Sequence, residues 1–206
     1  TVEEQAGLKE LIERAGGSRI ALPVHVRGDD ARLLIRKDKT ANSVGARLAG
    51  GANCTMEELL TAIKIGKVRA LVVLREDFLG EFGAEAMAGR GALDLLMTLD
   101  WRVTATVKAS DVALPLSAYG EMDGSFINFQ GRMQLLRPGL TPYEESDPGW
   151  KPLLEIASRL GGPAVPKNFR EAFRWAVSRV PVLAHLDTPA LGKLGVSLES
   201  PASERG

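Results

Sequence analysis

Apolar residues recur at helical spacing near the start of the chain and again in its last third. Residues 3–15 place their apolar side chains near one helical face and end at Gly16-Gly17, which predicts a helix. The Thr55-Met-Glu-Glu58 sequence is a capping box, so we expect a second helix to start there and to end at Gly66-Lys67. Residues 82–90 have the pattern of a further short helix.

Two more helices are expected in the last third. Asp147-Pro148 supplies an N-cap residue followed by a first-turn proline, which predicts a helix running through Leu160. Asn168 and Glu171 have the spacing of a capping box and predict a helix that carries Phe169, Phe173 and Val177. After Pro181 there is little periodicity, and we expect residues 200–206 to be frayed.

The strands are predicted from short apolar runs. Ala70–Leu74 contains no polar residue, which is typical of a strand buried on both faces of a parallel sheet. We therefore expect it to be the central strand, flanked by Leu95–Leu99, which contains Thr98, and by Arg19–Leu22, which ends at a proline. Val112–Leu114 should lie beyond Leu95–Leu99. Residues 27–53 are polar and glycine-rich, and we expect an irregular loop around Leu33–Ile35.

Strands that alternate with helices predict an α/β fold with a short parallel sheet, flanking helices and right-handed crossovers. We expect an α/β domain over residues 1–162 and a mostly helical appendage and tail over residues 163–206. The chain opens with Thr1 rather than Met, which suggests a processed subunit or an excised piece of a longer protein.

Composition narrows the function classes. The 206 residues are 45% hydrophobic and 25% charged, as in ordinary globular proteins. Lys and Arg total 26 and Asp and Glu total 26, so no strong net charge favours nucleic acid or an anionic membrane. No apolar run approaches the roughly 20 residues that cross a bilayer. We therefore expect neither nucleic-acid binding nor direct membrane insertion.

The sequence offers few residues that could bind a metal or a phosphate or act in catalysis. Cys54 is the only cysteine, so it forms no internal disulfide, and an iron–sulfur cluster needs about four thiolates. His25 and His185 have no cysteine or carboxylate at metal-site spacing, and we expect both to be structural. The glycine-rich residues 49–53 precede a helix start, as in a phosphate loop, but a plain turn is favoured because the Thr55 capping box uses those amides. We predict no metal ligand and no catalytic residue in this chain.

Two motifs at fixed spacing carry a resemblance to a known family. The first runs from Thr104 through Thr106 to Asp111-Val-Ala-Leu-Pro115. The second has, in order, Glu121, Gly124, Ser125, Asn128, Gln130, Gly131, Arg132 and Gln134. Together they resemble the third domain of the molybdopterin oxidoreductase superfamily, which includes formate dehydrogenases, nitrate reductases and the large iron–sulfur subunit of respiratory complex I.

The likeness covers roughly residues 40–162, and two features within it favour the complex I subunit. Residues 41–46 read Ala-Asn-Ser-Val-Gly-Ala, which resembles Ala-Asn-Ser-x-Gly-Ala of that subunit. Where cofactor-binding relatives have Gly-x-Asn-Pro after a strand, this chain has Arg75-Glu76-Asp77-Phe78, with two carboxylates where a diphosphate would lie. Alternatively, Glu76 and Asp77 simply begin a solvated helix cap.

The polar residues of the second motif have two interpretations. They could line a pterin pocket or touch a neighbouring subunit, and the candidates for pterin binding are then Arg75, Glu121, Asn128 and Arg132. We favour a structural role, in which Asp123-Gly124 forms a tight turn, Asn128 bonds its own backbone and Arg132 pairs with Glu121.

The resemblance implies a cofactor-free scaffold within the electron-transfer subunit of an NADH:quinone oxidoreductase. The iron–sulfur clusters would lie elsewhere in the parent protein, and the partners would be other subunits or domains of a respiratory complex at the cytoplasmic face of the membrane. One alternative is the domain that binds molybdopterin guanine dinucleotide in a catalytic molybdenum or tungsten enzyme such as a formate dehydrogenase. Another is a stand-alone binding module that retains only the fold. Whether the chain is itself part of an enzyme stays open.

Overall fold

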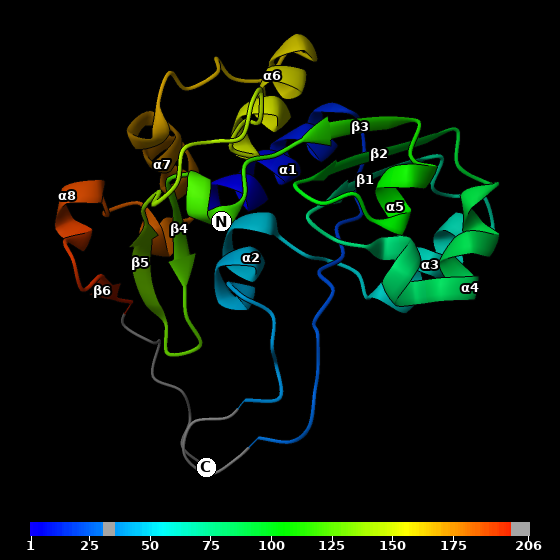
Figure 1. The fold of residues 1–206 in the computed structure, drawn as a ribbon, viewed down its shortest axis with the longest axis horizontal. Helices are drawn as coiled ribbons and strands as arrows, with labels where there is room; N and C mark the ends of the chain where they lie inside the picture. The colour runs from blue at the N-terminus through cyan, green and yellow to red at the C-terminus, as the bar shows by residue number, and fades with distance from the viewer. Residues whose placement is uncertain (31–35, 199–206) are drawn as a thin grey trace.

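The computed structural model describes residues 1–30 and 36–198, and one side of it is built on a three-stranded parallel sheet (Figure 1). The strands are β1 (Ala70–Leu74), β2 (Leu95–Asp100) and β3 (Val112–Pro115), in the order β1-β2-β3. Helices lie on both sides of this sheet, so the predicted α/β class, with a short parallel sheet and flanking helices, is confirmed.

Alternate residues of the strands face two separate apolar layers. Val73 and Leu96 pack with α3 (Met56–Lys64), α4 (Phe78–Arg90) and α5 (Ala105–Ala109). Val72, Leu74 and Leu99 pack on the other face with α1 (Val2–Arg14) and α6 (Trp150–Arg159). This two-sided burial is what the uninterrupted apolar runs predict.

A second layered unit adjoins the first through α1. Its antiparallel sheet contains β4 (Gly124–Ile127), β5 (Arg132–Leu136) and β6 (Val196–Ser197). Around it lie α2 (Ser43–Gly50), α7 (Phe169–Ser178), α8 (Thr188–Leu191) and two short 3-10 helices, η1 (Tyr119–Glu121) and η2 (Pro181–Leu183). Val2 and Ala6 of α1 join the core of this unit, together with Phe173 of α7. The domain boundary expected at residue 162 stays a prediction.

The expected strand order was wrong in its centre. β2, not β1, is the middle strand, and β3 lies beyond it as expected. The hydroxyl of Thr98 is hydrogen-bonded to Ser110, so this polar side chain is fully buried in the central strand without leaving its hydroxyl unpaired. Residues 19–22 form no strand, because the backbone of Ile20 is bonded to Asn53 and Cys54 instead of to β1.

Local capping signals were more reliable. Thr55 caps α3 in a reciprocal capping box, and Asn168 caps α7, as predicted. The start of α6 was misplaced: its N-cap is Gly149, while the Asp147 carboxylate pairs with Lys151. Helix α2 lies within the stretch expected to be an irregular loop, and Leu33–Ile35 and residues 200–206 fall outside the described residues.

None of the helices in residues 1–30 and 36–198 combines the length and the apolarity that crossing a membrane requires.

Candidate functional site

The carboxyl ends of parallel strands are where ligands bind in α/β folds, and here the first of these ends is filled by Arg75. Arg75 follows β1 with φ of 55°, a left-handed conformation that favours glycine. Its side chain is only 6% exposed and turns toward α1, where Nη2 lies 2.7 Å from Oε1 of Glu4. Nη2 also donates to the Ser117 carbonyl, and the guanidinium lies over the ring of Tyr119. The positive charge of Arg75 is therefore buried and paired with Glu4 in the protein interior.

The surroundings of Arg75 hold Glu4 ionised. Burial alone would raise the pKa of Glu4, but the Thr1 amino group and Arg75 lower it to about 2. Burial, reinforced by the negative charge of Glu4, raises the pKa of the nearby Tyr119 hydroxyl to about 12. Nη1 of Arg75 is buried and has no hydrogen-bond partner among the described residues.

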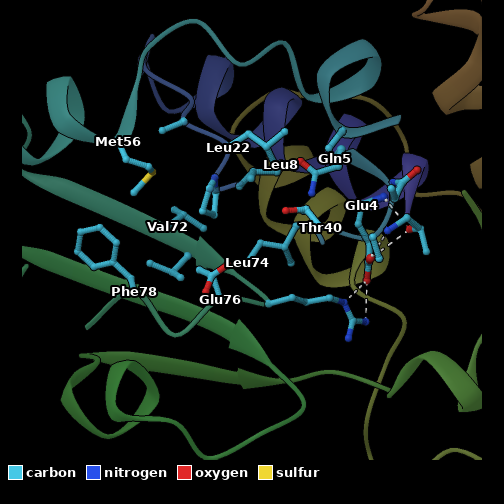
Figure 2. Close-up of a pocket in the computed structure, with 18 of the residues that line it drawn as sticks. Glu4, Gln5, Leu8, Leu22, Thr40, Met56, Val72, Leu74, Glu76 and Phe78 are labelled. Carbon is cyan, nitrogen blue, oxygen red and sulfur yellow. Dashed lines mark hydrogen bonds and ion pairs between the residues drawn. The ribbon is translucent and has the colours of Figure 1, made fainter. Parts of the chain in front are cut away.

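A cavity of about 150 Å³ lies between β1, α1 and the segments that precede α2 and α3 (Figure 2). Its walls include the apolar side chains of Leu8, Leu22 and Leu74, and the paired residues Glu4 and Arg75 also line it. Binding sites for organic ligands usually measure roughly 300–1,000 Å³. This cavity is thus too small for a dinucleotide.

The loop between β1 and α4 uses its own side chains to satisfy its backbone. Glu76 accepts from the Asp77 amide at 3.0 Å and contacts His25 Nε2 at 3.0 Å. Asp77 caps α4 by accepting from the Gly80 amide and from the hydroxyl of Thr106. Burial raises the pKa of Asp77, but these hydrogen bonds outweigh it and keep the pKa below its usual value. The helix-cap interpretation of this loop is confirmed, although the two carboxylates are partly buried rather than fully solvated.

A wider groove of about 820 Å³ lies at the ends of β2 and β3. Asp100 lines it, with a side chain that is 0% exposed. Its Oδ1 accepts from the amides of Trp101 and Arg102, whereas its Oδ2 has no partner among the described residues. Trp101 and Tyr143 also line the groove, and these residues are 50% and 71% exposed.

Sequence reasoning pointed to the loop after Leu99 but not to Asp100 itself. The available signal was an acidic residue placed directly after the buried run Leu95–Leu99. The carboxyl end of a central strand is the place where ligands approach an α/β sheet, so an acidic residue there was a candidate.

The four residues named for pterin binding do not form one cluster. Glu121 lines the groove beside Asp100, and its carboxylate accepts from the Ala118 amide. Arg75 lies in the wall of the smaller cavity. Asn128 accepts from the amides of Gln130 and Arg132 in the β4–β5 turn, which confirms its expected local role.

Two structural expectations for this motif were wrong. Arg132 donates to the carbonyl of Gly195 rather than pairing with Glu121, because β6 lies alongside its strand. Gly124 does not form a turn with positive φ; it begins β4, and a Cβ there would overlap Cγ2 of Thr1.

No group of three or more His, Cys, Asp or Glu side chains in the described part of the chain is arranged to hold a metal ion. Cys54 is a free thiol with a pKa raised by burial.

Comparison with known proteins identifies the family of this chain. The sequence pattern of the family described as Molybdopterin oxidoreductase matches residues 36–159. A protein of Staphylococcus aureus (strain USA300) named "Putative formate dehydrogenase" is 32% identical over 139 residues, which cover 66% of this chain and 14% of that protein. A protein of Bacillus subtilis (strain 168) with the same designation is 30% identical over 139 residues, covering the same 66% and 14%.

Among solved structures, acetylene hydratase from Pelobacter acetylenicus has a similar fold, with a TM-score of 0.50 and 18% identity, over 92% of this chain and 23% of that one. The chain thus spans only a small part of the length of its curated relatives. Since the family pattern covers more than half of the sequence, this chain belongs to the molybdopterin oxidoreductase family.

Proposed function

We propose that this chain is a cofactor-contacting domain of a larger molybdenum or tungsten oxidoreductase of the formate dehydrogenase type. The two bacterial relatives bear formate dehydrogenase names, and neither bears the name of a complex I subunit. The family match therefore supports this alternative better than the complex I scaffold expected from the sequence. The activity of the whole protein belongs to this proposal, since the chain covers 14% of those relatives.

The observation that carries the proposal is the groove at the ends of β2 and β3, whose wall includes Asp100. Oδ2 of Asp100 is buried just behind this wall and has no partner among the described residues, so a ligand reaches it when the side chain turns toward the groove. A buried carboxylate oxygen without a donor is costly, by about 1–3 kcal/mol or more, so a ligand that supplies a donor gains affinity there. Guanine, the base of molybdopterin guanine dinucleotide, presents two neighbouring N–H groups that one carboxylate can accept. Tyr143 and Trp101 are exposed aromatic residues on which a planar base can stack, although Arg102 already lies over the ring of Trp101.

The fit to the whole cofactor is incomplete. The groove suits the guanine end, whereas the loop after β1 does not suit the diphosphate, because Glu76 and Asp77 occupy its amides with carboxylates. The metal and pterin supply the redox chemistry in such enzymes. The part proposed for this chain is to bind and orient the base through Asp100, with Glu121 in the same groove wall.

Calorimetric titration of the 206-residue chain with guanosine, inosine and adenosine tests the proposal. We expect guanosine to bind best, since inosine lacks the amino group and adenosine lacks the ring N–H. Asp100→Asn should weaken guanosine binding about 10-fold or more, the usual effect of losing a hydrogen bond to a charged acceptor. Glu57→Gln, an exposed change on α3, is the control and should bind as the original chain does. Equal weak binding of all three nucleosides would contradict the proposal.

A second candidate function is the cofactor-free scaffold. It is favoured because Arg75 is paired with Glu4 and because the Asp77 amide after β1 already donates to the Glu76 carboxylate. Its partners would be other domains or subunits of a respiratory complex at the cytoplasmic face of a membrane, with no nucleic acid involved. This candidate predicts no guanosine binding by the original chain and no effect of Asp100→Asn on its partner contacts.

A further inference from the structure

We infer that the loop after β1, residues 75–81, excludes phosphate, so that the edge of the sheet recognises a base and not the diphosphate attached to it. This inference deepens the proposed function and rests on it for the identity of the base. The exclusion itself rests on three features of the loop that hold whatever ligand the neighbouring groove takes.

The first feature is that four of the five amides from Asp77 to Glu81, at the start of α4, are already bonded, the exception being that of Phe78. A helix N-terminus attracts anions through backbone N–H groups that lack an acceptor. Here Asp77 N–H donates to Glu76, Gly80 N–H donates to Asp77, and Leu79 N–H donates to the hydroxyl of Thr106 at 2.8 Å. The Glu81 amide donates to the Asp77 carbonyl. A phosphate would have to break these hydrogen bonds before it could form its own.

The second feature is charge. Glu76 and Asp77 place two carboxylates side by side at the helix start, and Glu81 follows in the first turn. Asp77 receives three hydrogen bonds from Gly80 and Thr106, which favour its ionised form. His25 contacts Glu76 at 3.0 Å and approaches Glu81 at 4.0 Å, so the one imidazole nearby faces two carboxylates. A diphosphate at this place would be repelled.

The third feature is the direction of Arg75, the cation at the end of β1. Its side chain ends at Glu4 of α1, where both Nε and Nη2 lie within 2.8 Å of Oε1. The carbonyl of Ser117 and the sulfur of Met122 also contact Nη2. The loop therefore lacks a cation directed outward among residues 75–81.

The test uses inorganic pyrophosphate and NMR of the 206-residue chain. We expect the amide signals of Asp77, Leu79, Gly80 and Glu81 not to shift with pyrophosphate at millimolar concentrations. Glu76→Ala frees the Asp77 amide and removes one charge, so this variant should show saturable shifts at the same amides. Glu57→Ala, which removes an exposed glutamate from the first turn of α3, is the matched control and should behave as the original chain does. Saturable shifts in the original chain would overturn the inference.

A second measurement separates the inference from the proposed function. If guanosine binds, we expect guanosine 5′-diphosphate to bind no more than about twofold tighter, and tenfold tighter binding through the loop amides would overturn the inference. If neither binds, the guanine proposal fails, and the pyrophosphate experiment still decides whether the loop excludes phosphate.

Discussion

The buried pair between Glu4 and Arg75 makes the stability of the fold depend on pH. The pKa of Glu4 lies at about 2 in the folded chain against 4.5 for the free side chain, so its ionised form is stabilised by folding. That stabilisation is complete above about pH 4.5 and is lost as the pH falls toward 2. A pKa lowered this far corresponds to about 3 kcal/mol of stability.

We predict that Glu4→Gln removes most of this pH dependence and lowers the free energy of unfolding at pH 7 by about 3 kcal/mol, within the range for breaking a buried ion pair. Urea unfolding of both proteins between pH 2 and pH 7 measures the difference. Glu58→Gln is a useful comparison, because Glu58 is exposed and caps only its own helix. Parallel pH profiles for the original chain and Glu4→Gln would show that the pair does not contribute in this way.

The close packing around Gly124 leads to a second prediction about a single residue. A side chain there would meet the buried Thr1, so Gly124→Val should destabilise the fold by about 1–3 kcal/mol, as overpacking does. Cys54→Ser should cost less, since Cys54 is only partly buried and has no disulfide partner. Thermal melts of the two variants compare them directly, and a larger fall in Tm for Cys54→Ser would contradict the prediction.

Among the elements, β2 should open last. It pairs with a strand on each side, and Leu96, Thr98 and Leu99 are fully buried, whereas Ala70 at the start of β1 is exposed. Central strands exchange their amide hydrogens only when the whole fold opens. We predict slower hydrogen exchange at residues 96–99 than at residues 71–73, measurable by NMR or mass spectrometry. Faster exchange in β2 would mean that the sheet opens from its middle strand.

The elements that could be predicted from the sequence are those specified by near neighbours. Thr55 and Asn168 cap helices through residues three positions away, so a local pattern reveals them. Helix α2 could not be found in this way, because the carboxamide oxygen of Asn42 accepts from Ile127 N–H, far along the chain. The centre of the sheet was misjudged for the same reason: only the folded chain brings Ser110 to Thr98.

The candidate site, which draws on the whole molecule, could likewise be predicted only in part from the sequence. The sequence alone located the strand ends and showed that residues 75–78 differ from the Gly-x-Asn-Pro of cofactor-binding relatives. The partner of Arg75 is Glu4, on the first helix, and the unpaired oxygen of Asp100 is recognisable only once its neighbours are in place. Charges that are close in space but distant in sequence have no periodicity that would reveal them.

Helix α1 joins both layered units, since Leu11 packs under the parallel sheet and Val2 packs beside the antiparallel one. Its main helical neighbours include α6 and α7, which come from the last third of the chain. During synthesis on the ribosome, α1 leaves the exit tunnel well before α6 and α7, so the part of its surface that these two helices cover stays exposed until they follow. A chain arrested before residue 150 would carry that partly exposed helix, and such unfinished chains are the ones that chaperones retain and that associate with one another.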